Sequence, residues 1–542
     1  MPTTGDDLAP EIWLAIADEV VASDRYSEGR LPSRYMAVNR VFFNLYLDTV
    51  YGDVQWTKVD KDMMKQLKRL QKPIIASHVR SLRIHAWFID YLMKRDAKTD
   101  VPSTLCARIL SLFNTNAKPH PSNQAQTKLI SSVSSKTIMD LMISAIHNMK
   151  SVTEYHFELR DLRLTKDSSR FLVAARQAFS SSLRKLSVHT TIFKFKSVLA
   201  LSDFEHLEEL ELHFDYQCHR THGEDAHEAS KFAEAQELKD TIVPFINLRK
   251  ETIQSLTIAS YSMVDLSDFF KSIGPFRSLR RLSANICLDT KQLSDSKALV
   301  DLIYNHRSSI LELDIRPRPP EEDFINVEDT AARRKESAVR IQKALLEHRD
   351  VARSLEGLQI PVGDLNACLA LIDRSSHSLT HLSLIDWFFS LEDLKRVLNL
   401  FAPNPFRLKS LFVWVQDLSV PLLQLLAGRL PGLHSLVLLF ETCTSNHTHQ
   451  MEDHFYHQLA VSSKEGRLDW QVEHISIIQI KSTISPEDAE LLGVPSTAGY
   501  TDPTYTSAVS AAIPSIKSDK GIQWHRKLPP RRINSTPPSP YG

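Results

Sequence analysis

The stretch that decides the fold is LKSLFVWVQDLSVPLLQLLAGRLPGLHSLVL, residues 408–438. It opens and closes with one signature, in which apolar residues occupy the first, fourth and sixth positions: Leu408, Leu411 and Val413, then Leu433, Leu436 and Leu438. The last two apolar positions are two residues apart, so they lie on one face of a β-strand. Between the signatures, Val420 to Leu426 has apolar residues at helical spacing. The stretch therefore predicts a strand, a helix and a second strand.

The same signature returns about a dozen times between residues 79 and 477, and most successive starts lie 24 to 31 residues apart. This spacing is close to the roughly 20–29-residue period of leucine-rich repeats, and the longer gaps indicate a repeat plus an insertion. We therefore expect an α/β solenoid of irregular repeat length, with a curved parallel sheet inside and helices outside. An ordinary doubly wound α/β fold is the alternative, which the absence of Gly-rich turns disfavours.

Composition excludes several classes of function. The chain has 542 residues, and its 65 Lys and Arg balance its 65 Asp and Glu, so nothing global indicates binding to nucleic acid or to an anionic membrane. Its five cysteines are dispersed without a CxxC pair, as in reduced cytoplasmic or nuclear proteins. The acidic start lacks the apolar stretch of a signal peptide.

The first sixty residues differ from the repeats. Residues 8–20 predict an amphipathic helix, in which Pro10 suits the first turn and Ile12, Ile16 and Val20 form an apolar stripe. A polar loop follows, and residues 35–47 predict a second helix. A piece this short cannot bury both faces of its helices internally. We expect a partner, or the solenoid itself, to cover the remaining apolar surface.

This N-terminal pattern resembles the F-box family. The resemblance rests on Leu8, Pro10-Glu11-Ile12-Trp13, Ile16, Val20, Val38-Asn39-Arg40, Phe42-Phe43 and Leu45. Two departures are Ala9, where the family has proline, and a long polar loop at residues 24–30. The resemblance implies binding to the adaptor subunit of a cullin–RING ubiquitin ligase, through these residues: Leu8, Pro10, Ile12, Ile16, Val38 and Phe42.

These patterns divide the chain into three parts. We expect a helical F-box and linker over 1–60, and a leucine-rich-repeat-like solenoid over 61–485 with insertions near 115–137, 219–240 and 316–350. The remaining residues, 486–542, form a basic segment rich in Pro and Ser, for which we expect a disordered tail that builds no core.

Catalytic chemistry finds no support in the sequence. The 14 glycines form no phosphate-binding loop, and no nucleophile or zinc-protease motif occurs. Histidines gather near 219–227 and 447–457, but we expect solvated loops there and not a metal site. We therefore expect no catalytic residues, no cofactor and no metal. An enzyme with a site built in the insertions remains a remote alternative.

The face of the sheet opposite the signature residues is the better candidate for binding, and we call it the open face. Parity places Glu209, Glu211, Glu312 and Asp314 there in the early and middle repeats, and Ile385, Phe412, Trp414, Val437 and Leu439 in the late ones. We call the second set the apolar column. It predicts either a substrate-binding site or a surface that the end of the chain covers as a cap. If it is covered, the partner is to be sought on the earlier charged positions.

The resemblance implies the substrate-recognition subunit of an SCF-type cullin–RING ubiquitin ligase of fungal type. In it, the F-box binds the adaptor and the solenoid binds a protein substrate. A protein-interaction scaffold with a degenerate F-box is the alternative. Neither nucleic acid nor a membrane is an expected partner.

Overall fold

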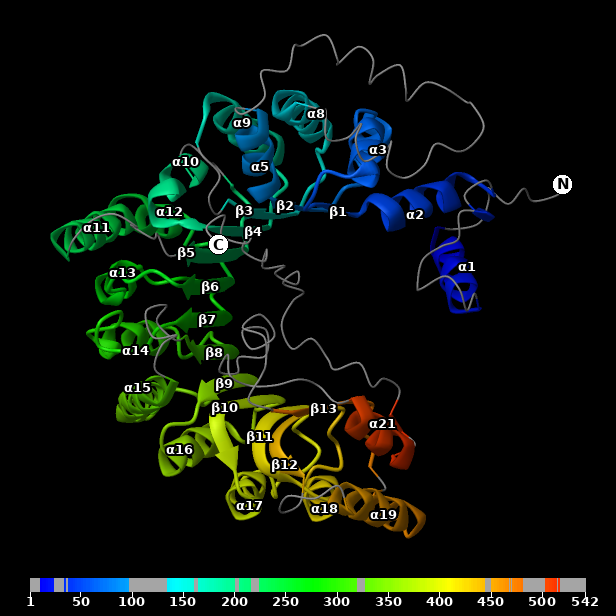
Figure 1. Cartoon of the computed structure of the whole chain (residues 1–542), viewed down its shortest axis with the longest axis vertical. Coiled ribbons are helices and arrows are strands. Elements are labelled where there is room, and N and C mark those ends of the chain that lie inside the picture. Colours follow the sequence, from blue (N-terminus) through cyan, green and yellow to red (C-terminus); the bar gives the residue numbers. More distant parts are fainter. Residues whose placement is uncertain are drawn as a thin grey trace, which may run out of the picture. The chain divides into compact units, whose positions relative to one another are not determined.

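The structure is a computed structural model, which describes residues 10–23, 34–35, 38–96, 134–159, 164–199, 204–215, 224–318, 327–443, 450–466, 468, 470–480, 503–513 and 515–516. The chain forms two compact units, residues 1–253 and 254–542. Each is described separately, with the labels of Figure 1. The three-part division at 60 and 485 that the sequence suggests remains a prediction.

The first unit contains five parallel strands whose order in space is their order in the chain. They are β1 (Asp53–Trp56), β2 (Ser81–His85), β3 (Glu154–Glu158), β4 (Lys185–Thr191) and β5 (Glu209–Asp215). The register aligns equivalent signature positions, so that Leu82, Tyr155, Leu186 and Leu210 form one row across four strands.

The second unit continues the pattern with eight parallel strands, again in chain order. They are β6 (Ser255–Ser260), β7 (Arg281–Ile286), β8 (Glu312–Pro317), β9 (Gly357–Pro361), β10 (His381–Phe389), β11 (Ser410–Leu418), β12 (Ser435–Cys443) and β13 (His474–Gln479). A doubly wound sheet would reverse its strand order part-way, and no reversal occurs among the described strands of either unit. The arrangement is that of a solenoid.

The helices between consecutive strands lie along one side of them in each unit, whereas, among the described helices, two precede the first strand and one follows the last (Figure 1). The helices of the first unit are α1 (Pro10–Ser23), α2 (Arg40–Tyr51), α3 (Lys61–Leu70), α4 (Pro73–Ala76), α5 (Trp87–Asp96), α8 (Ser135–Asn148), α9 (Lys166–Phe179), α10 (Phe195–Leu199), α11 (Glu224–Glu237) and α12 (Val243–Asn247), with a 3-10 helix η3 (Ile192–Lys194) and a π-helix η4 (Leu238–Ile242). In the second they are α13 (Ser267–Ser272), α14 (Ser296–Asn305), α15 (Val327–Glu347), α16 (Leu365–Ser375), α17 (Leu391–Asn399), α18 (Val420–Arg429), α19 (Gln450–Lys464) and α21 (Pro503–Ala512).

The apolar signature explains the core. All twelve signatures coincide with strands β2 to β13, and in each of them all three apolar residues are buried. In β5, buried and partly exposed residues alternate strictly, as a strand with one face on the core requires. The strand prediction is confirmed. Two of the three segments expected to be insertions contain long helices, α11 and α15, among their described residues.

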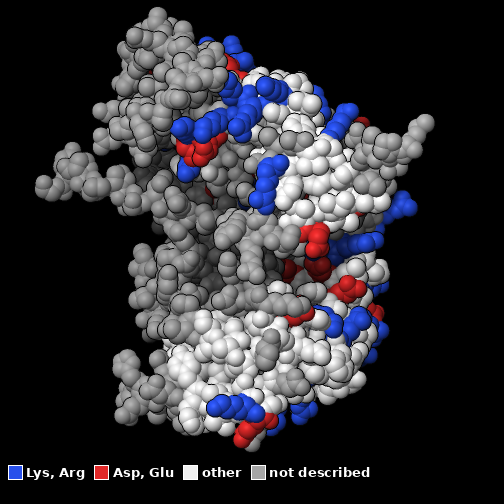
Figure 2. Space-filling view, turned by 90° about the vertical axis from the view of Figure 1, so that its right-hand side faces the viewer, with Lys and Arg blue, Asp and Glu red and all other residues white. Residues whose placement is uncertain are grey.

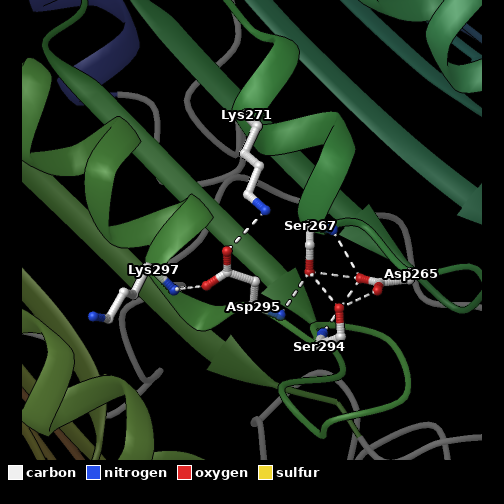
Figure 3. A network of polar contacts seen from close by, with 6 residues as sticks. All are labelled: Asp265, Ser267, Lys271, Ser294, Asp295 and Lys297. Carbon is white, nitrogen blue, oxygen red and sulfur yellow. Dashed lines mark hydrogen bonds and ion pairs between the residues drawn. The ribbon is translucent and has the colours of Figure 1, made fainter.

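Polar contacts join neighbouring repeats where helices α13 and α14 begin (Figure 3). The carboxylate of Asp265 accepts hydrogen bonds from the backbone N–H and the hydroxyl of both Ser267 and Ser294. Partial burial raises the pKa of Asp265, but these hydrogen bonds outweigh burial and hold the pKa below its usual value. Asp295 caps α14 through the N–H of Lys297 and pairs with Lys271 at 2.8 Å. The network therefore fixes the register of two repeats.

The segment after residue 486 differs from its expected disorder, because residues 503–512 form helix α21. Tyr505, Val509 and Ile513 are buried, and Tyr505 packs edge-on against Phe440 with ring centroids 5.2 Å apart. The hydroxyl of Thr506 accepts from the N–H of Ile477 at 3.1 Å and donates to its carbonyl at 3.0 Å. Because β13 is the last strand of its unit, α21 covers an edge whose backbone would otherwise be unpaired.

Candidate functional site

Helix α1 exposes apolar side chains that a soluble helix would normally bury. Its inner stripe is Trp13, Ala17, Val20 and Val21, which pack with α2. Ile12 and Ile16 lie on one side of this stripe, because successive residues of a helix turn by about 100°. They are 46% and 38% exposed. We call these two side chains the α1 flank. The sequence placed Ile12, Ile16 and Val20 in one apolar stripe and predicted adaptor contacts for Ile12 and Ile16. In the structure only Val20 of the three packs inward.

The second helix contributes both to this small core and to the exposed surface. Phe42 is 2% exposed, and its ring meets that of Trp13 edge-on at 5.5 Å between centroids. Helix α1 already covers Phe42 in the folded chain, and its predicted role in contacting an adaptor stays a prediction. Val38 and Phe43 are instead 55% and 37% exposed. Phe43 was not among the predicted site residues, although its neighbour was.

The start of α2 shows why the sequence pattern there is polar. Asn39 is the N-cap, and its side-chain oxygen accepts a hydrogen bond from the N–H of Phe42 at 2.9 Å. This satisfies a backbone donor that the helix itself cannot pair. Two further adaptor contacts were predicted in this region. Pro10 is the first residue of α1, whereas Leu8 lies outside the described residues, as does the loop at 24–30.

The apolar column of the late repeats is buried, which favours the covered surface among the two alternatives that the sequence left open. Ile385, Phe412, Trp414, Val437 and Leu439 are 0–7% exposed and form one cluster with Ile478. Phe388 and Ile480 pack against it. Parity predicted correctly that these side chains share one face, but the face is covered. They cannot receive a partner in this conformation.

The open face of the first unit is charged, as the sequence predicted. Lys185 lies 2.9 Å from Glu211 and 3.8 Å from Glu209, and its side chain is only 7% exposed. In the second unit, Arg281 forms a two-pronged ion pair with Glu312, at 2.5 and 2.8 Å. The Arg281–Glu312 pair is exposed, and a pair of this kind contributes only about 0–1 kcal/mol to stability.

Asp314 completes the charged positions of the second unit. Its carboxylate accepts hydrogen bonds from Ser283 at 3.0 Å and from Arg316 at 3.0 and 2.8 Å. Glu312 is 48% exposed and Asp314 is 19% exposed. The predicted charged set is thus in place on the open face, with each of its four carboxylates already engaged by a cation or a hydroxyl.

A row of histidines on the first unit was missed by the sequence analysis. The register places His85, Glu158, His189 and His213 side by side on β2 to β5. Glu158 lies 3.7 Å from His85 and 3.8 Å from His189, and His189 also contacts Asp215. The signal was available, because all four residues stand six positions after a signature start, on the open face.

No described group of His, Cys, Asp and Glu side chains has the geometry to hold a metal ion. No helix in the described ranges combines the length and the apolar character that crossing a membrane requires. The candidate site therefore consists of the exposed apolar side chains of α1 and α2 and the ion pairs of the open face. Both kinds of group can form non-covalent contacts with a partner.

Comparisons with known proteins add little. No family model matches the chain, and no curated protein matches its sequence. Among solved structures, a chain in the crystal structure of a Rad7 and Elc1 complex from yeast is 14% identical, with 70% of this chain and 94% of that chain covered and a TM-score of 0.28. This is a distant likeness, and no residue role is transferred from it.

Proposed function

We propose that this protein is the substrate-recognition subunit of an SCF-type cullin–RING ubiquitin ligase. Helices α1 and α2 act as an F-box that binds the adaptor, and the solenoid binds a protein substrate. Two features support the proposal. One is the sequence pattern of residues 8–45, and the other is the exposed apolar surface that α1 and α2 present.

The exposure of the α1 flank is the observation that carries the proposal. Ile12 and Ile16 share one side of α1, and Val38 and Phe43 add exposed apolar side chains at the start of α2. Apolar side chains that gather on a small helical pair indicate an interaction surface, because burying them against a partner is favourable by about 25 cal/mol per Å². A scaffold with a degenerate F-box would instead bury this flank within its own chain.

In this function the chain supplies no reacting group. It holds a substrate near the ubiquitin-carrying enzyme, so catalysis arises from proximity within the complex. Because the apolar column is buried, we place the substrate surface at the charged positions of the open face, namely Glu209, Glu211, Glu312 and Asp314. A substrate that meets them would exchange the existing ion pairs for its own charged groups.

The test is adaptor binding by the full chain with Ile12→Asp. A carboxylate buried in an apolar interface without a partner costs several kcal/mol, so binding should be lost. Leu8→Asp should have the same effect if the F-box pattern extends to that residue. Affinity would be measured by calorimetry with a purified fungal adaptor subunit.

Leu14→Asp is the matched control. Leu14 is 46% exposed, as Ile12 is, but it lies on the opposite side of the buried stripe of α1. The control should retain binding and should melt at the same temperature as the Ile12 variant. Undiminished binding by a folded Ile12→Asp protein would refute the proposal. Failure of the wild-type chain to bind would favour the scaffold alternative.

A further inference from the structure

Helix α3 and the residues just after it carry a series of exposed lysines. Lys61, Lys65, Lys68 and Lys72 follow one another at intervals of four, three and four residues, and all are exposed. We call them the lysine stripe. Helical spacing places Lys61, Lys65 and Lys68 along one side of α3, opposite the buried residues Met63, Met64, Leu67 and Leu70. Lys72 lies two residues beyond the end of α3 and is the N-cap of α4. Lys65 is 49% exposed, and Asp62, at 3.6 Å, is 90% exposed.

The lysine stripe adjoins the helices that carry the exposed apolar surface. Helix α4 packs against both α2 and α3, and its Ile74 is 64% exposed only two residues after Lys72. Arg69 of α3 donates a hydrogen bond to the hydroxyl of Tyr51 in α2 at 3.1 Å. An exposed apolar side chain of α4 therefore lies close in the chain to the exposed lysines. In Figure 2, which faces the side where these helices lie in Figure 1, Lys and Arg predominate over Asp and Glu in the upper part.

We propose that the partner covering the α1 flank also reaches the lysine stripe and is acidic where it does so. This inference rests on the proposed function and adds the charge of the partner's surface to it. Charge complementarity selects an acidic surface, because a series of exposed cations attracts an anionic surface and repels a cationic one. The neighbouring exposed Ile74 favours a protein surface over nucleic acid, which binds mainly through phosphates and has no need of apolar neighbours.

The physical consequence is a faster encounter. Complementary charges at the rim of an interface act chiefly on the association rate, and salt screens them. The apolar contacts of the α1 flank govern dissociation instead. The two parts of the surface are therefore separable by kinetics, and a change confined to the lysine stripe should leave the lifetime of the complex nearly constant.

The experiment compares the full chain with the double variant Lys65→Glu/Lys72→Glu, with purified adaptor as the analyte. At low salt the association rate should fall on the order of tenfold, while dissociation changes little. The difference between the two proteins should shrink at about 0.5 M salt, where the screening length is only a few ångströms. Lys65→Gln/Lys72→Gln, which adds no negative charge, should give a smaller effect in the same direction.

The matched control is Lys343→Glu/Lys395→Glu in the second unit. Lys395 is 46% exposed and lies 3.5 Å from Glu392 one helical turn away, which reproduces the setting of Lys65 and Asp62. Lys343 is exposed on α15. This variant introduces the same charge change on helices of the other unit, α15 and α17, which are not part of the proposed surface, so its association rate should equal that of the wild type.

Four results would overturn the inference. Unchanged association by a folded Lys65→Glu/Lys72→Glu protein, with Ile12→Asp still abolishing binding, would reject the acidic contact and leave the proposed function intact. An equal loss in the control would assign the effect to net charge. The wild-type chain could also bind duplex DNA, with the Lys65→Glu/Lys72→Glu protein losing that binding while its adaptor association stays unchanged. This result would show that the lysine stripe binds nucleic acid and not an acidic protein surface. If the wild-type chain fails to bind the adaptor, both proposals fall.

Discussion

Trp414 lies in the middle of β11 on the open face, while Leu411 of the same strand lies on the helix side. Both are buried, with exposures of 1% and 0%. Trp414 belongs to a packed cluster, and its ring lies 5.4 Å from that of Phe388. Its indole N–H has no hydrogen-bond partner in the described part of the chain, so the side chain contributes through packing alone.

We expect Trp414→Ala to lower the free energy of unfolding by about 3–5 kcal/mol, as much as Leu411→Ala, because each leaves a cavity in a packed core. Denaturant unfolding would measure both. Phe406→Ala is the control, since Phe406 is 60% exposed and its loss should cost about 0.5 kcal/mol or less. A Trp414 variant as mild as the control would show that the column is uncovered in solution.

Asp386 lies in a strained part of the backbone. It has φ of 62°, in the left-handed region, at a point where the register between β10 and β11 shifts. Its side chain is 12% exposed, and Arg334 lies 3.7 Å away. Burial raises the pKa of this carboxyl to about 6, although the charge of Arg334 acts in the opposite direction.

The raised pKa fixes the sign of a pH effect. Asp386 binds its proton more tightly in the folded state, so its contribution to stability is fully present below its ordinary pKa of 3.8 and is lost as pH rises through about 6. Between pH 4 and 7 the free energy of unfolding of the wild type should fall by roughly 2 kcal/mol relative to Asp386→Asn. Parallel pH profiles for the two proteins would contradict this.

These residues also mark the limit of what the sequence could predict. Parity correctly placed Trp414 on the open face, because side chains alternate along a strand. Parity does not say what covers a face, so the burial of the column could not follow from it. Likewise, the sequence around Asp386 carries no sign of its positive φ, which arises from the register shift between two strands that are 20 residues apart or more.

At the scale of elements, the strands were predictable and the last helix was not. Each strand of the repeats carries its own apolar period, which is a local signal. Helix α21 has a period too, since Tyr505, Val509, Ala512 and Ile513 are spaced as one helical face. The Pro and Ser content of the surrounding segment favoured a prediction of disorder over one of a helix. Helix α21 packs against α19 and β13 at the end of the sheet. The sequence alone does not show which strand forms that end, so this packing could not be predicted.

Helix α21 should therefore be needed for stability. Removal of residues 500–542 should lower the melting temperature markedly, because it uncovers Phe440 and leaves the edge of β13 without Thr506. Removal of 517–542 alone is the control and should leave the melting temperature unchanged, as the composition of that segment predicts. Equal melting temperatures for both truncated proteins would show that α21 is not a cap. Differential scanning calorimetry would decide.

At the scale of the whole molecule, contacts between strands are confined to neighbours in the chain. Within each unit every strand packs on the strands before and after it, and α1 packs only on α2 among the described elements with substantial contacts. In such an array, a local loss of stability spreads to adjacent repeats and fades with distance along the chain. Binding by α1 and α2 and the stability of the last repeats are therefore expected to be independent properties.

Leu438→Ala tests this independence. Leu438 is fully buried in β12, so its truncation should cost about 2–5 kcal/mol locally. Hydrogen exchange should accelerate in β11, β12 and β13 and in the helices beside them, because the free energy of local opening falls there. Protection of β2 and β3 should stay at the wild-type level, and adaptor affinity should stay within about twofold, a difference smaller than 0.5 kcal/mol. Faster exchange throughout the first unit would instead show that the two units unfold as one cooperative body, which would leave no part of the chain able to bind while another opens.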